Sequence, residues 1–242
     1  MRNGTYHLAT KAFEQALSID NTPRARASCA YGRGVCGIGS ARESKQELLR
    51  ARSFVNDLST LAPTDSLYLQ AITDSTTHNF KRAVETHRQM VEMAPDSEKV
   101  YALVDLGRAY DRNGEPEKAL ESLREATKRD PLCAAAFLQL GVLESRNQEL
   151  EKASASFDIA EEIYRPQGDI AGQVEVHYQR GTLYLKQQGK TKEAKTQFER
   201  TLEPAGAADN EMGQLLASLQ LSEIAFIEGD TVKAEKGARR SG

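Results

Sequence analysis

The feature of this sequence that most constrains its fold is a pattern that returns after 34 residues. Gly107 and Gly141 are 34 residues apart, and so are Ala119 and Ala153. Two independent pairs of small residues at one spacing indicate an internal repeat. A unit this short cannot bury an apolar core alone, so the pattern favours a fold in which neighbouring units stack on one another.

Each repeat is predicted to be a pair of helices joined by a short turn. In residues 100–131, the first helix carries apolar and small residues at spacings of three and four, which place them on one face. These residues are Leu103, Leu106, Gly107 and Tyr110. Asn113 and Gly114 mark the turn, and Pro116 suits the first turn of the next helix. The second helix has a similar stripe at Ala119, Leu123 and Ala126.

The next unit repeats this order with Phe137, Leu140 and Gly141, followed by Ala153 and Phe157. The order resembles the tetratricopeptide repeat, whose first helix carries Leu-Gly and then Tyr, and whose second helix carries Ala, an aromatic residue and a final Pro. The resemblance implies an all-α fold. It would be a right-handed α-solenoid of stacked antiparallel helix pairs, with about 12 to 13 helices in all.

The second-helix alanine marks seven units along the chain. These alanines are Ala9, Ala51, Ala83, Ala119, Ala153, Ala194 and Ala234, and Phe198 follows Ala194 as Phe157 follows Ala153. We therefore expect a single solenoid over residues 1–242. Its units are a partial one at 1–23, a degenerate one at 24–63, the best ones at 64–99, 100–133 and 134–166, and further ones at 167–206 and 207–242. The ragged ends suggest a fragment of a longer protein, or a homodimer formed through uncapped solenoid ends.

The stretch YGRGVCGIGS at residues 31–40 raises a different possibility, because Gly32, Gly34 and Gly37 have the spacing of a phosphate-binding loop. Such a loop follows a strand, and nothing before it alternates as a strand does. The repeat instead places Gly32 at the position of Gly107 and Gly39 at the turn. Gly34 and Gly37 have no assigned role. We therefore predict a helix pair here and no nucleotide site.

Composition and motifs point away from catalysis and from several ligand classes. The chain has 32 basic and 35 acidic residues, so its net charge of −3 gives no overall attraction to nucleic acid. Three cysteines without a CxxC motif and four scattered histidines suggest neither a metal site nor an active site. No apolar run approaches the roughly 20 residues of a membrane span, and no signal peptide opens the chain. We expect a cytoplasmic, non-enzymatic protein without cofactor or metal, whose partner is a protein or peptide.

The resemblance also implies where a partner binds. In this family, positions on the first helix of each unit face a concave groove. The matching residues are Tyr68, Tyr101, Arg108, Asp111, Arg112 and Arg146. They form an aromatic and basic strip, although a plain solvated helix face would have the same pattern. The Lys and Asn with which one sub-family binds the carboxylate tail of chaperones are replaced here by Val104 and Arg108, or in the next unit by Leu138 and Val142, so that ligand is not expected.

Residues 168–194 follow an insertion after Pro166, and two registers fit their first helix. Either Gly181 is the crossing glycine with Tyr184 after it, or Tyr178 and Leu185 carry the stripe. The second register keeps Ala194 in phase with the other alanines.

The segment EVHYQRG within this unit resembles tetratricopeptide regions that follow the kinase domain in some bacterial serine/threonine protein kinases. The resemblance makes Tyr178, Gln179 and Arg180 candidates for a specific contact, the alternative being helix packing around the insertion. The leading hypothesis is thus a non-catalytic scaffold that binds a peptide or a partner protein. The second is a regulatory or sensory module of a bacterial kinase or transcription regulator.

Overall fold

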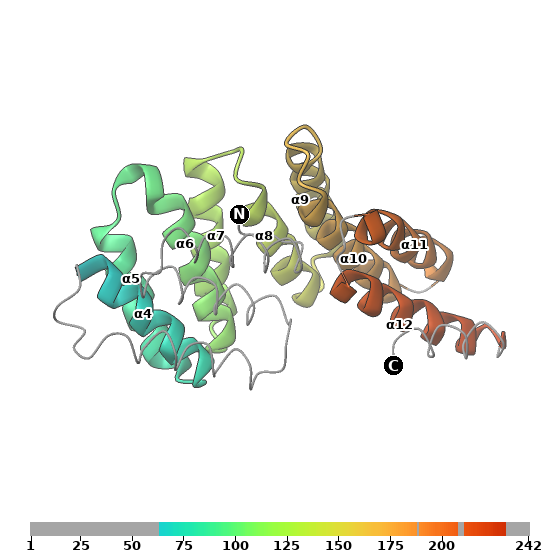
Figure 1. Cartoon of the computed structure of the whole chain (residues 1–242), viewed down its shortest axis with the longest axis horizontal. Coiled ribbons are helices and arrows are strands. Elements are labelled where there is room, and N and C mark those ends of the chain that lie inside the picture. Colours follow the sequence, from blue (N-terminus) through green and yellow to red (C-terminus); the bar gives the residue numbers. More distant parts are fainter. Residues whose placement is uncertain (1–62, 188, 208–210, 231–242) are drawn as a thin grey trace. The chain divides into compact units, whose positions relative to one another are not determined.

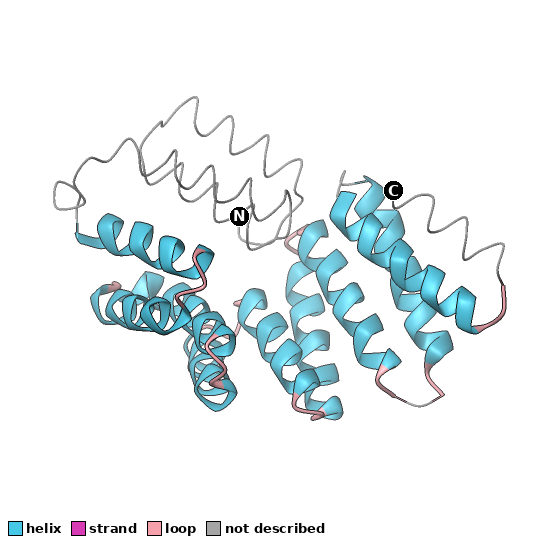
Figure 2. Cartoon of the chain, turned by 90° about the horizontal axis from the view of Figure 1, so that it is seen from below, coloured by secondary structure: helices cyan, strands magenta, loops and turns pink. Residues whose placement is uncertain are grey.

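The computed structural model describes residues 63–187, 189–207 and 211–230, and every regular element in these ranges is an α-helix (Figures 1 and 2). The predicted all-α class is therefore confirmed for this part of the chain. Gly32, Gly34, Gly37 and Gly39 lie outside the described residues. So do the unit at 1–23, residues 24–62 of the next unit, the end of the last unit, and the chain ends through which we expected a homodimer.

The described residues fall into two compact units, 63–139 and 140–230. The first unit contains four complete helices and the beginning of a fifth, because the boundary between the units falls inside that helix. These helices are α4 (Pro63–Thr76), α5 (Phe80–Met93), α6 (Asp96–Arg112), α7 (Pro116–Arg129) and the beginning of α8 (Ala134–Arg146). In this unit α4 packs against α5, α5 against α6 and α6 against α7, as expected for stacked helix pairs.

The second unit continues with the end of α8 and four further helices. These are α9 (Leu150–Tyr164), α10 (Ile170–Leu185), α11 (Thr191–Ala207) and α12 (Glu211–Ile227). In it α10 is central, because it packs against α9, α11 and α12 (Figure 1). None of the described helices has the length and apolar composition needed to cross a membrane.

Local sequence signals explain where these helices begin and end. Pro116 lies in the first turn of α7, where a missing backbone N–H costs nothing. Gly114, in the turn before it, has φ of +78°, a conformation that glycine adopts without strain. The carboxylate of Asp169 accepts a hydrogen bond of 2.8 Å from the backbone N–H of Gly172 and so caps the N-terminus of α10 after the insertion.

The two helices of a repeat approach each other at the glycine that the sequence singled out. A Cβ atom added to Gly107 would lie 2.8 Å from Leu123 Cγ, and one added to Gly141 would lie 2.7 Å from the ring of Phe157. Both distances are shorter than carbon atoms tolerate. Phe157 and Leu123 are almost completely buried. The predicted crossing role of Gly107 and Gly141 is therefore confirmed.

The same contact settles the register of α10. A Cβ on Gly181 would lie 2.7 Å from the ring of Phe198, so Gly181 is the crossing glycine and the register that left it out is wrong. Leu185 is exposed, so it does not belong to the buried apolar stripe of α10. Ala194 is nevertheless fully buried, because the connection between α10 and α11 is longer than its counterparts and restores the phase of α11.

The crossing contact generates the first prediction. Gly141→Ala forces a methyl group into the ring of Phe157, which has no space to yield, so we expect the free energy of unfolding to fall by about 1 to 3 kcal/mol. Gly206→Ala in α11 is the matched control, since no atom lies within 4 Å of the added methyl group. It should be neutral or stabilise by up to about 1 kcal/mol. Urea unfolding monitored by circular dichroism measures both, and equal midpoints for the two variants would contradict this packing.

Candidate functional site

Three of the predicted groove residues share one face of α6. Tyr101, Arg108 and Arg112 are separated by seven and four residues, which brings them into line along a helix. Tyr101 is 44% exposed and Arg112 is also exposed, while Asp111 is half-buried beside them. The structure therefore brings together the four α6 residues that the sequence predicted for the strip.

Arg108 differs from its neighbours because packing encloses most of it. Its side chain is 15% exposed, and its Nη1 atom lies 3.4 Å from the buried carboxylate of Asp105. The positive charge of Arg108 compensates the negative charge of Asp105 within the protein. Arg108 therefore contributes to packing beneath the exposed residues of the strip and presents little charge to a ligand. Tyr101 and Arg112 are the side chains that reach furthest into solvent.

The remaining predicted strip residues lie elsewhere. Tyr68 is on α4, and its side chain lies outside the described residues. Arg146 is exposed at the end of α8 and belongs to the 140–230 unit. The α6 strip therefore consists of the four predicted residues on that helix: Tyr101, Arg108, Asp111 and Arg112.

Tyr178, Gln179 and Arg180 do not form one contact patch, because consecutive helical residues point about 100° apart. The ring of Tyr178 packs against Phe198, with 5.7 Å between the ring centroids. Gln179 donates a hydrogen bond of 2.8 Å to Glu175 on its own helix. Arg180 faces α9. The alternative that we left open, helix packing around the insertion, accounts for Tyr178 and Arg180.

Arg180 joins α9 to α10 through two carboxylates. Its Nη2 atom lies 2.7 Å from Asp158 Oδ1, and its Nη1 atom lies 2.5 Å from Glu161 Oε2. The other oxygen of Glu161 is 2.6 Å from Nη2 of Arg165. Only 7% of the Arg180 side chain is exposed, so its charge is neutralised within the fold. Sequence reasoning missed this cluster because its carboxylates precede Arg180 by 19 and 22 residues.

The groups around this cluster have shifted proton affinities. Burial tends to raise the pKa of Glu161, but hydrogen bonds and charge from Arg180, together with the bond from Arg165, outweigh it and hold the pKa below its usual range. Burial lowers the pKa of His177 against the opposing charge of Glu161. The Nδ1 atom of His177 lies 3.1 Å from Gln197 Oε1, and a hydrogen bond donated to that oxygen raises the pKa of His177, although burial outweighs it.

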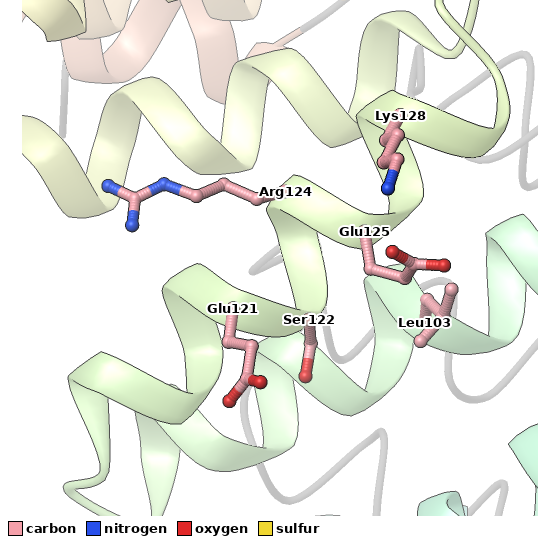
Figure 3. Close-up of a pocket in the computed structure, with 6 residues that line it drawn as sticks. All are labelled: Leu103, Glu121, Ser122, Arg124, Glu125 and Lys128. Atoms are coloured by element: carbon pink, nitrogen blue, oxygen red, sulfur yellow. The ribbon is translucent and has the colours of Figure 1, made fainter.

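A second surface lies along α7, where two adjoining hollows of about 550 and 410 Å³ share Glu121 and Ser122. Figure 3 shows the larger one, in which the Glu125 carboxylate lies near the Leu103 side chain and the Arg124 side chain extends away from both. Its lining residues are Leu103, Glu121, Ser122, Arg124, Glu125 and Lys128. The four charges alternate in sign along α7, so this hollow carries no net charge.

Chemistry at these surfaces is limited by their residues. Among the described residues that line the two hollows along α7 there is no histidine or cysteine. Burial raises the pKa of the Cys133 thiol, which keeps it protonated and poorly reactive. Within the described part of the chain, no group of three His, Cys, Asp or Glu side chains is arranged to hold a metal ion.

Paired helices that cross at a glycine and stack on their neighbours define a helical-repeat protein. Two models of the tetratricopeptide repeat family match this sequence, one over residues 104–167 and the other over residues 175–203. The chain therefore carries tetratricopeptide repeats, as the sequence predicted. A search of curated protein sequences found no match.

Several solved structures share this fold. BtubC from P. vanneervenii is similar with a TM-score of 0.65 and 19% identity, over 84% of this chain and 87% of that one. MamA has a TM-score of 0.53 and 20% identity, over 71% and 91%. A signal-transduction ATPase with numerous domains and a tetratricopeptide repeat sensor, from Pyrococcus horikoshii, has a TM-score of 0.57 and 17% identity. The match covers 81% of this chain but 33% of that one. At these identities the likeness concerns the fold.

The ion cluster generates a prediction about stability. Arg180→Met leaves the largely buried Glu161 with one partner fewer, so we expect the free energy of unfolding to fall by about 2 to 4 kcal/mol. Arg165→Met removes the other partner of Glu161, but the Arg165 side chain is 68% exposed and should cost less than about 1 kcal/mol. Urea unfolding of both variants tests this, and equal losses would contradict the assignment of Arg180 as the enclosed partner.

Stability should also depend on pH, since the pKa values of Glu161 and His177 are both lowered in the folded state. The unfolded chain then binds protons more readily, so their contributions are present at neutral pH and are lost on acidification. The loss begins below 6.5 for His177 and below 4.5 for Glu161, the ordinary pKa values. Melting temperatures across pH 4 to 8 should therefore fall with acid. His177→Gln should flatten the part between about pH 6.5 and 5, and an unchanged profile would contradict the burial of His177.

Proposed function

We propose that this protein is a non-catalytic scaffold that binds a peptide segment of a partner protein on the α6 strip. The observation that carries the proposal is the pair Tyr101 and Arg112, whose side chains are exposed on α6 although the residues between them are largely packed. Tyrosine and arginine are the residues that most often anchor protein interfaces. The tetratricopeptide fold supports protein binding in general terms.

Packing holds α6 in place while Tyr101 and Arg112 stay exposed. Leu103, Leu106 and Gly107 point into the core and onto α7, so the helix is held firmly from one side. The Tyr101 ring lies on the other side and offers a rigid apolar surface with few rotatable bonds to freeze on binding.

The second candidate function is a regulatory or sensory module of a larger signalling protein. It is favoured by the similarity in fold to the Pyrococcus horikoshii ATPase, in which a tetratricopeptide region is named as a sensor and forms part of a much longer chain. The kinase-linked resemblance of residues 174–180 points in the same direction. A module of this kind also acts by binding, so both candidates use the same surface. A reading frame that continues upstream into a kinase domain would favour the second.

The binding surface can be tested with a charge-matched pair of variants. Chemical cross-linking and mass spectrometry identify a partner, and calorimetry with the purified partner then measures its affinity. Tyr101→Ala with Arg112→Glu should weaken binding at least about tenfold, because it removes an aromatic anchor and reverses an exposed charge. Lys128→Glu, on the α7 surface, makes the same change in net charge and should leave the affinity within about twofold. Melting temperatures check that both variants fold.

The comparison distinguishes the two surfaces. If the α7 variant loses binding while the α6 variant keeps it, then the partner occupies the hollows along α7 and the α6 proposal is wrong. If both variants bind as the parent protein does, neither surface is the binding site.

A further inference from the structure

The last helix that the structure describes, α12, is apolar on two opposite sides (Figure 1). On one side, Ala217 and Ile224 are buried in a hydrophobic core that α12 shares with α11. The other side carries Leu219, Phe226 and Ile227, whose side chains are 43%, 70% and 72% exposed. Spacings of seven and eight residues place these three side chains along one face of the helix.

The exposed side of α12 is not needed to hold the helix in place, because the opposite side already packs against α11. Single apolar side chains are common on protein surfaces, whereas a group of large ones on one face marks an interaction site. An aromatic ring and two branched aliphatic side chains provide the kind of apolar centre that protein interfaces have.

The charge on this face is negative. α12 contains two acidic residues and no basic one. Glu223 is exposed between Leu219 and Phe226 on the same face, and it forms no ion pair within the described residues. Glu228, just beyond the helix, differs because Lys195 lies 3.0 Å from it. A partner whose basic side chain meets Glu223 would therefore complement this face in charge as well as in polarity.

We propose that the α12 face, formed by Leu219, Glu223, Phe226 and Ile227, binds an amphipathic segment of a partner protein that combines apolar side chains with lysine or arginine. The apolar side of such a segment would cover the three exposed apolar residues, and a cation at its border would pair with Glu223. This face shares no residue with the α6 strip and lies in the other compact unit. It is therefore a second interaction surface, beyond the one in the proposed function.

Two other ways of covering the α12 face conflict with its charge. A second copy of the chain that met α12 with its own α12 would bring two Glu223 carboxylates into one interface, and neither helix has a cation to compensate them. A membrane surface with anionic headgroups would repel Glu223 as well. A basic segment of a partner protein removes this repulsion and still buries the apolar side chains.

The experiment measures the fluorescence anisotropy of a fluorescein-labelled peptide, LKKLLKLLKKLLKL, whose leucines share one helical face, with the full chain. We expect saturable binding to the parent protein. Phe226→Ser with Ile227→Ser removes most of the apolar contact and should weaken binding by about tenfold or more. Met93→Ser with Leu132→Ser removes two exposed apolar side chains from the 63–139 unit and should change the affinity by less than about twofold. Thermal unfolding confirms that each variant is folded at the assay temperature.

The charge preference is tested with a second peptide, in which glutamate replaces every lysine. The parent protein should bind it at least about tenfold more weakly than the lysine peptide. Glu223→Lys reverses the exposed charge and leaves the apolar residues in place, so it should weaken binding of the lysine peptide and strengthen binding of the glutamate peptide. A variant that merely lost its structure would bind both peptides more weakly.

Several outcomes would overturn the assignment of the α12 face. One is the absence of binding of the lysine peptide to the parent protein, and others are equal affinity in the two double variants or equal binding of the two peptides. Self-association that Phe226→Ser with Ile227→Ser abolishes, measured by size-exclusion chromatography with light scattering, would assign the face to a second copy. Sedimentation with phosphatidylcholine vesicles that the same variant abolishes would assign it to a membrane. None of these results depends on Tyr101 or Arg112, so each leaves the proposed function standing.

Discussion

The repeats depend on one short approach, between a glycine on the first helix and a large side chain on the second. Without a Cβ atom at Gly141, the ring of Phe157 can lie against the backbone of α8, and Gly181 allows the same for Phe198 against α10. Interiors are packed so closely that one methyl group at such a point cannot be accommodated without movement. The contact also fixes the rotation of the first helix, and so determines which of its residues are directed away from the second.

That coupling explains how much of the molecule could be predicted from the sequence. Gly107 and its 34-residue spacing to the next glycine predict the helix pairs and the face of α6 that carries Tyr101. The register of α10 could not be settled in the same way. Gly181 and Ala194 are 13 residues apart instead of 12, and the sequence does not show where a connection takes up the additional residue. Only the position of the Phe198 ring, a contact between helices, decides it.

The candidate site was less predictable than the fold, because the exposure of a charged residue depends on partners that are distant in sequence. Arg180 belongs to a segment that resembles a regulatory region, yet Asp158 and Glu161 on the preceding helix enclose its charge. No sequence motif singles out Lys186, and Ser145, which accepts its hydrogen bonds, precedes it by 41 residues. Periodicity identifies the residues on a helix face, whereas the pairing of charges becomes visible only when the helices are placed together.

Arg180 and Lys186, two cations of the 140–230 unit, therefore differ in how the protein compensates their charge. A guanidinium enclosed by two carboxylates, as in Arg180, has exchanged its hydration for internal bonds, and a ligand could compete for it only by breaking the α9–α10 contact. Lys186 has exchanged part of its hydration for neutral oxygens of Ser145 and lies beside Arg146, so its charge is oriented but not compensated by an ion pair within the described residues. In a chain whose net charge is −3, such local basicity does not follow from composition.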